Sequence, residues 1–178
     1  IFQLNTVPNA SLSLITLPEL AGIEAEPDGL AISSDGGVGL VANERSGSFC
    51  LISLPDGGLL STTVIEPDIP APPYNIDQRK ATKRTEPEES ELIEKDGILY
   101  AVVALQESHA VVVYNVSDPA NPVFDSIAPT GIDYENDTGM EKSIIGTEGL
   151  AVHSQNGIIF TANEREGSIT MLKSAWTQ

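Results

Sequence analysis

The sequence predicts an all-β fold assembled from repeated antiparallel sheets, and two observations carry this prediction. The stretch Asp28–Leu51 returns without a gap as Glu148–Met171, displaced by 120 residues. Within each copy, short apolar runs alternate with polar turns that contain glycine. Self-similarity at a fixed spacing is the signature of a repeat architecture, and short apolar runs between turn residues are typical of strands.

The two copies are identical at eleven positions, which lie in the first strand, the first turn and a polar corner. In the first copy these residues are Gly29, Leu30, Ala31, Ser34, Gly37, Ala42, Asn43, Glu44, Arg45, Gly47 and Ser48, and in the second they are Gly149, Leu150, Ala151, Ser154, Gly157, Ala162, Asn163, Glu164, Arg165, Gly167 and Ser168. A third, looser copy, Asp96–Val113, has Ala104–Glu107 in the place of Ala42–Arg45. We interpret the repeated corners as structural, with each arginine in an ion pair or in contact with the neighbouring repeat.

Each copy has the pattern of a β-meander. A first strand (Leu30–Ile32 or Leu150–Val152) leads into an Asp-Gly or Asn-Gly turn, which supplies the positive φ angles of a tight hairpin. A second strand follows at Val38–Ala42 or Ile158–Ala162, then the polar corner, then a third strand at Ser48–Leu54 or Ser168–Leu172. With a fourth strand between copies, this is the blade of a β-propeller. The chain has room for about three to four blades, so the ring is incomplete unless another chain closes it.

The remaining segments are assigned around these blades. The alternating stretch Ser11–Leu17 is expected to be an outer strand that feeds the first blade. Residues 66–91 are rich in proline and charge and are expected to form an insertion between blades. The dibasic pair Lys83-Arg84 within it is either a protease processing site or simply solvated charge. The second blade is expected over Leu92–Val116, and the whole chain is expected to be a single β-propeller-like domain or fragment.

Composition restricts the function. The net charge is −17, with nine basic and twenty-six acidic residues, so nucleic acid is excluded as a partner because phosphate contacts need clustered lysine and arginine. The charge instead favours cations, or is a solvated acidic surface. No apolar run approaches the roughly 20 residues of a membrane span. The chain begins at Ile1, which suggests processing or truncation.

A calcium site is predicted in the loop between Gly131 and Gly146. Asp133, Glu135 and Asp137 place a carboxylate at every second position, as many calcium loops do. The pattern is not that of an EF-hand, since Thr138 stands where that loop requires glycine and Ile144 where it requires glutamate. A single cysteine, Cys50, and two separated histidines exclude a zinc centre and a disulfide framework.

Three Asn-X-Ser/Thr triplets begin at Asn9, Asn115 and Asn136, and each is a potential N-glycosylation site in a secreted protein.

These residues resemble a known family. Ile145–Leu150, Phe160–Glu164 and Gly167–Ile169 are similar to the closing blade of the choice-of-anchor I domain, which occurs in mesenchyme-specific cell surface glycoproteins. Val103–Ser108 resembles the blade corner of that family, and Glu26–Leu30 its Pro-Glu-Gly opening with Asp28 as the acid. The resemblance implies an extracellular or cell-surface propeller of the seven-bladed type, often without catalytic activity. More remotely, the blades are similar to those of phytase-like propellers.

Two functions follow from these observations. The first is an extracellular structural or interaction protein, acidic and glycosylated, in a matrix or filament. The alternative is a calcium-dependent phosphoester hydrolase of the phytase-like kind, which would need carboxylate-held metal ions and basic residues for phosphate. No Ser-His-Asp or Cys-His set is recognisable, which favours a protein that is not an enzyme. The expected partner is another copy, or another propeller chain, bound through exposed edge strands at Ser11–Leu17 or Ser168–Leu172.

Overall fold

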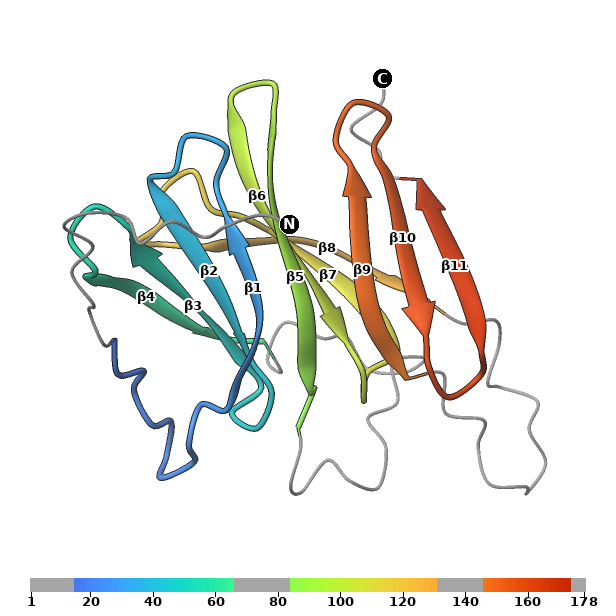
Figure 1. The fold of residues 1–178 in the computed structure, drawn as a ribbon, viewed down its shortest axis with the longest axis horizontal. Helices are drawn as coiled ribbons and strands as arrows, with labels where there is room; N and C mark the ends of the chain where they lie inside the picture. The colour runs from blue at the N-terminus through green and yellow to red at the C-terminus, as the bar shows by residue number, and fades with distance from the viewer. Residues whose placement is uncertain (1–14, 66–83, 131–145, 174–178) are drawn as a thin grey trace, which may run out of the picture.

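The computed structural model describes residues 15–65, 84–130 and 146–173, and these residues form eleven strands in three antiparallel sheets (Figure 1). The first blade contains β1 (Pro27–Ile32), β2 (Val38–Asn43), β3 (Ser48–Ser53) and β4 (Leu59–Val64). The second contains β5 (Pro87–Lys95), β6 (Ile98–Leu105), β7 (Ala110–Asn115) and β8 (Val123–Pro129). The third contains β9 (Thr147–His153), β10 (Ile158–Asn163) and β11 (Ser168–Lys173). The all-β, propeller-like fold predicted from the repeats is confirmed, and the sheets do not close into a ring.

The strands of each blade follow one another in chain order, so the first strand of each blade lies at an inner edge. β5 contacts both β1 and β9, and these three inner strands run through the middle of the molecule (Figure 1). The inner strands are therefore where the three blades meet.

The hairpins follow from the turn residues. Asp96 and Gly97, the two residues between β5 and β6, both have positive φ angles (54° and 77°), as a two-residue type I′ turn requires. That turn matches the right-handed twist of the paired strands, so β5 and β6 form a long hairpin.

The core lies between the blades. One cluster joins the first and second blades through residues such as Leu40, Phe49, Val103 and Tyr114, and the rings of Phe49 and Tyr114 meet edge to face with centroids 5.0 Å apart. A second cluster joins the second and third blades. Both faces of the second blade are thus covered, which explains why β6 and β7 are almost continuous runs of apolar residues.

Two segments differ from the sequence-based expectation. The expected outer strand Ser11–Leu17 is wrong over its described part, because Ile15–Leu17 form no strand and Leu17 instead packs on the face of Val41 and Cys50. The fourth strand of the first blade is β4, which pairs with β3 after the hairpin. In addition, β5 begins at Pro87, so the second blade starts inside the stretch 66–91 that the sequence assigned to an insertion.

Among the described residues, no helix has the length and hydropathy of a membrane span.

Candidate functional site

An acidic residue occupies the same place in each inner strand. Asp28 on β1, Glu88 on β5 and Glu148 on β9 follow one another at a constant spacing of 60 residues. In each blade, the backbone N–H of a corner residue donates to the carbonyl oxygen two residues before the acid: Glu44 to Glu26 (2.9 Å), Gln106 to Glu86 (2.8 Å) and Glu164 to Gly146 (2.9 Å). This repeated hydrogen bond anchors the corner of every blade beside the start of its inner strand.

The first two inner strands approach each other very closely. A Cβ atom on Gly29 would lie 2.1 Å from the carbonyl oxygen of Glu88, so no other residue fits at position 29 without displacing β5. The carboxyl groups of Asp28 and Glu88 therefore come close enough to interact, and this interaction raises the pKa of Glu88.

The electrostatics of the inner strands disfavour negative charge on Glu88. Its pKa is raised to about 9, mainly because the carboxyl is buried, then because of the hydrogen bond with Asp28 and the negative charges of Glu148, Asp28 and Glu44. Burial also raises the pKa of Glu148, helped by the charge of Glu164 and opposed by the hydrogen bond from Gln106. Glu88 therefore holds a proton at neutral pH when no cation neutralises its neighbours.

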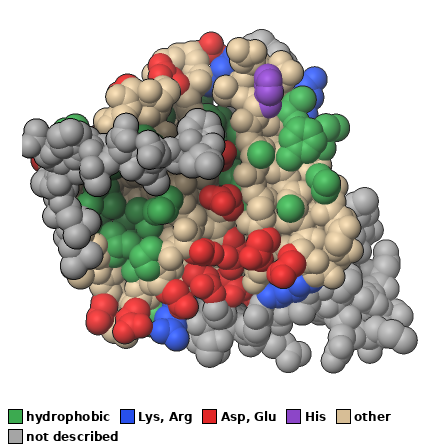
Figure 2. Space-filling model, viewed as in Figure 1, with side chains coloured by type: hydrophobic (Ala, Val, Ile, Leu, Met, Phe, Trp, Pro, Cys, Tyr) green, Lys and Arg blue, Asp and Glu red, His purple; other side chains and the backbone are tan. Residues whose placement is uncertain are grey.

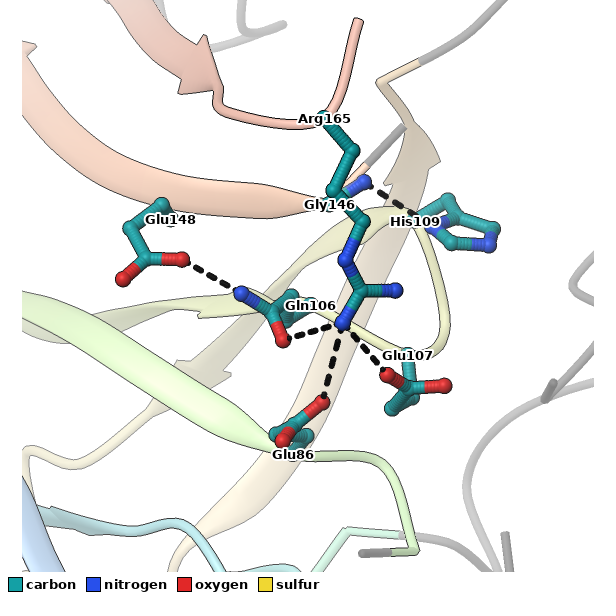
Figure 3. A network of polar contacts seen from close by, with 7 residues as sticks. All are labelled: Glu86, Gln106, Glu107, His109, Gly146, Glu148 and Arg165. Atoms are coloured by element: carbon teal, nitrogen blue, oxygen red, sulfur yellow. Dashed lines mark hydrogen bonds and ion pairs between the residues drawn. The ribbon is translucent and has the colours of Figure 1, made fainter. Parts of the chain in front are cut away.

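An arginine from the third blade inserts into the corner of the second blade (Figure 3). Arg165 Nη2 donates to Glu107 Oε1 at 2.9 Å and to Gln106 Oε1 at 2.8 Å, and it lies 3.9 Å from Glu86 Oε2. The amide Nε2 of Gln106 donates in turn to the carboxylate of Glu148. Because Glu107 is fully buried, Arg165 supplies the opposite charge that compensates for removing this carboxylate from water.

Three carboxylates are arranged so that they could hold a metal ion. Glu44, Glu86 and Glu88 each offer one oxygen, and these oxygens all lie within 4.8 Å of one another. Glu86 and Glu88 are buried on the second blade, whereas Glu44 comes from the corner of the first. Figure 2 shows acidic side chains gathered over the middle of this face. A donor set made only of carboxylate oxygens suits a hard cation such as Ca²⁺ or Mg²⁺.

The repeated corners connect the second and third strands of their blades, and their asparagines, which end β2 and β10, hold the hairpins. Asn163 Nδ2 donates to Ser168 Oγ (3.1 Å) and Thr170 Oγ1 (2.8 Å), and Asn43 Nδ2 donates to Ser48 Oγ (3.2 Å). Arg45 pairs with Glu24 (3.2 Å) and Glu26 (3.4 Å) at the surface. Of the corner residues, Glu44 is one of the three clustered carboxylates described above. The negative charge of Glu164 contributes to the raised pKa of Glu148.

Most of the other sequence-predicted sites lie outside the described residues, namely Asp133, Glu135, Asp137, Asn9, Asn136 and Lys83. Asn115 ends β7, where its Oδ1 accepts the backbone N–H of Ser117 at 3.0 Å. Arg84 is partly buried with a positive φ of 55° and packs against the corner glycine Gly47.

The inner-strand acids were not predicted from the sequence, although a signal for them exists. Asp28, Glu88 and Glu148 recur every 60 residues, but the third copy was aligned on its corner, where Gln106 stands 62 residues after Glu44. The hairpin of β5 and β6 has longer strands than that of β1 and β2, so Glu88 and Gln106 are two residues further apart than Asp28 and Glu44, and Glu88 falls out of that alignment. Aligning the strands that precede each corner would have found the acids.

Comparisons with known proteins support the fold. No protein-family model and no curated protein matches the chain. Solved structures with similar folds include a 6-phosphogluconolactonase candidate from Bacteroides fragilis (15% identity, TM-score 0.55, 84% of this chain and 35% of that one). A Lactobacillus plantarum protein (18%, 0.51, 83% and 41%) and the dihydro-heme d1 dehydrogenase NirN (16%, 0.51, 85% and 26%) are also similar. The chain thus spans less than half the length of these propeller-like structures, and at such low identity the likeness concerns the fold alone.

Proposed function

We propose that this chain is part of an extracellular interaction propeller that binds a divalent cation between the inner strands of its blades. The observation that carries the proposal is the convergence of Glu44, Glu86 and Glu88, whose carboxylate oxygens lie within 4.8 Å of one another. Because these residues come from two blades, a bound cation would link the blades and stabilise their arrangement.

The surroundings of the three carboxylates support a cation. The negative charges of Asp28, Glu148 and Glu44 act on Glu88. Repulsion among neighbouring carboxylates is reduced when one of them binds a proton or when a cation binds between them. Arg165 supplies one positive charge nearby, but it lies closer to Glu107 (2.9 Å) than to Glu86 (3.9 Å). A divalent ion would add the charge that the acidic inner strands lack.

The extracellular and interaction part of the proposal rests on the sequence. The resemblance to the choice-of-anchor I domain, the three glycosylation triplets and the net charge of −17 support it. Glycopeptide mapping of the natural protein tests it, with N-linked sugar expected on at least one of Asn9, Asn115 and Asn136. Unmodified peptides at all three positions would contradict a secreted glycoprotein.

The phosphoester hydrolase remains the alternative, but no observation favours it. Such an enzyme needs basic side chains that are available to phosphate. Among the described residues, Arg165 is the basic side chain that lies beside the buried carboxylates. Its Nη2 already donates hydrogen bonds to Glu107 and Gln106, so it is not available to phosphate.

Thermal unfolding with and without cations tests the proposed site. Protein freed of metal with a chelator and then given Ca²⁺ or Mg²⁺ at pH 7 should gain about 2.7 kcal/mol of stability at a concentration 100 times the dissociation constant. The double variant Glu86→Gln/Glu88→Gln should lose this gain.

Two controls locate the effect. Glu94→Gln removes a charge from an exposed position of the same strand β5 and should keep the gain. Asp133→Asn/Asp137→Asn removes the predicted calcium loop and should also keep most of it. If the loop variant abolishes the gain and the Glu86/Glu88 variant does not, the inner strands are not the site.

A further inference from the structure

The inner strands meet at two junctions with equivalent backbone and different side chains. The first junction lies between the first and second blades and contains the proposed cation site, and the second junction lies between the second and third blades. By repeat position, Gln106 replaces Glu44, Gly146 replaces Glu86, and Glu148 corresponds to Glu88. Glu86 and Gly146 have similar positive φ angles (50° and 60°), and each accepts a hydrogen bond from the corner N–H of its own blade. At these positions, the second junction therefore lacks two of the three carboxylates of the first.

A guanidinium group occupies the second junction (Figure 3). Arg165 Nη2 lies 2.8 Å from Gln106 Oε1 and 2.9 Å from Glu107 Oε1. The same nitrogen lies 3.9 Å from Glu86 Oε2. Gln106 also donates through Nε2 to the carboxylate of Glu148, the inner-strand acid of the third blade. One positively charged group is thus surrounded by two carboxylate oxygens and an amide oxygen of the second blade.

Gly146 provides the space through which Arg165 reaches the second blade. A Cβ atom on Gly146 would lie 2.8 Å from Cγ and 2.9 Å from Cδ of Arg165, so any other residue would displace the arginine stem. In the first blade, the equivalent position is Glu26, and the equivalent arginine, Arg45, pairs with it at the surface (3.4 Å). The glycine and the buried position of Arg165 therefore belong together.

We propose that Arg165 takes the place of a metal ion at the second junction and excludes one from it. The comparison with a metal ion rests on the proposed function, in which a cation binds at the first junction. Carboxylate and amide oxygens, which surround Arg165 Nη2, are ligands that also suit Ca²⁺. Arg165 fills their shared space with a permanent positive charge. The first junction would then respond to the cation concentration, whereas the second would not.

Removal of the guanidinium group should convert the second junction into a cation site. Arg165→Met keeps an unbranched stem over Gly146 and opens the space that the guanidinium group occupied. Because the side chain of Arg165 is 23% exposed, ions in solution can reach that space. The change is made in a background protein that lacks the other two candidate cation sites. Its substitutions are Glu44→Gln, Glu88→Gln, Asp133→Asn and Asp137→Asn.

Thermal unfolding at pH 7, with and without saturating Ca²⁺, tests the proposal. Ca²⁺ should raise the Tm of the background protein with Arg165→Met by about 5 °C or more. It should leave the Tm of the background protein itself unchanged, because Arg165 is still present there. Arg45→Met, the same change at the equivalent exposed corner, should show no shift. Addition of Glu107→Gln to Arg165→Met should abolish the shift, because it removes a ligand that only the second junction has.

Two results would overturn the proposal: a folded Arg165→Met protein whose Tm does not respond to Ca²⁺, or an equal response when Arg165 is present. If Arg165→Met is unfolded without Ca²⁺, the ion should restore the circular dichroism spectrum of the folded protein, since binding to the folded state drives folding. Absence of that recovery would equally contradict the proposal. The proposed function fails separately, if Ca²⁺ does not stabilise the protein in which Glu44 and Glu88 are intact.

Discussion

The two best-matched copies of the repeat, Asp28–Leu51 and Glu148–Met171, have similar sequences and different surroundings. Phe49 in the first copy is fully buried, whereas Ile169 at the same repeat position in the second is 75% exposed. The first copy is followed by another blade, and the described part of the chain contains no blade beyond the second copy. In this fold, the repeat determines which side chains are apolar, but the neighbouring blade determines which of them are buried.

The corners show the same contrast for charge. Arg45 forms ion pairs with Glu24 and Glu26, two residues that precede the first strand of the same blade. All three side chains are exposed. Arg165 instead reaches the preceding blade, where Glu107 stands at the corner position that arginine has in the other two copies. One repeat position therefore serves as a surface ion pair in the first blade and as a buried link between blades in the third.

The largest difference in the free energy of unfolding is expected between truncation of the buried Phe49 and truncation of the exposed Ile169. Phe49→Ala should lower the free energy of unfolding by about 3–5 kcal/mol, because it removes a fully buried ring from the core between two blades. Ile169→Ala, at the equivalent exposed position, should change it by less than about 0.5 kcal/mol in the monomer. Urea denaturation of both variants measures the difference, and equal losses would mean that Ile169 is buried in the folded chain.

The arginine pair gives the next largest effect. Arg165→Ala should cost about 3 kcal/mol, because it removes the ion pair between Arg165 and the buried carboxylate of Glu107. Arg45→Ala should cost less than about 1 kcal/mol, since its partners are exposed. The same denaturation experiment compares them. Similar costs for the two variants would show that Arg165 does not link the blades as described.

The pH dependence of stability should differ between variants of Glu88 and Glu148. Glu88 lies on β5, which contacts both other inner strands, and Glu148 lies on β9. The pKa of Glu88 on β5 is raised to about 9, so the folded protein binds more protons than the unfolded chain above the ordinary glutamate range. Stability in the absence of divalent cations should therefore fall as pH rises from about 5 towards 9, by at most about 1.4 kcal/mol per pH unit for one proton. Glu88→Gln should flatten this dependence more than Glu148→Gln does, as measured by unfolding at several pH values. An identical pH dependence in both variants would contradict the assignment.

The corner asparagines give the smallest difference. Asn163 makes three side-chain hydrogen bonds, with Thr161, Ser168 and Thr170, whereas the buried Oδ1 of Asn43 has no hydrogen-bond partner among the described residues. Asn163→Ala should therefore cost about 1 kcal/mol more than Asn43→Ala, at roughly 1 kcal/mol for each net hydrogen bond. Thermal unfolding of both variants measures the difference, and a larger loss in Asn43→Ala would contradict this account of the corners.

The fold could be predicted from the sequence because its evidence is local. The Gly-bearing turns and apolar runs located β2, β3, β10 and β11 closely, since turn chemistry and strand pattern agree there. The start of β5 was missed because Pro87 and several glutamates are typical of loops. Those glutamates lie in a strand because β1 and β9 flank it, and that is a tertiary effect.

Most of the candidate site could not be predicted from the sequence, because it too depends on tertiary contacts. Glu44 and Glu164 were singled out as corner residues, but nothing local to Glu86 and Glu88 indicates that they lie beside Glu44. Their proximity depends on the close approach of β1 to β5 at Gly29, which follows from the packing of whole blades. The 60-residue recurrence of the acids is the one signal in the sequence, and it is visible only when the inner strands are aligned.

The most direct test of the cation site is the number of protons released when Ca²⁺ binds. Glu88 holds a proton at pH 7 because its pKa is about 9, and a cation binds the deprotonated carboxylate. Isothermal titration calorimetry of the Asp133→Asn/Asp137→Asn protein, in buffers of different ionisation enthalpy, measures this release away from the predicted loop site. We expect about one proton per bound Ca²⁺ at pH 7 and none well above pH 9. Absence of binding heat, or a heat independent of the buffer at pH 7, would contradict the assignment of the site to Glu44, Glu86 and Glu88.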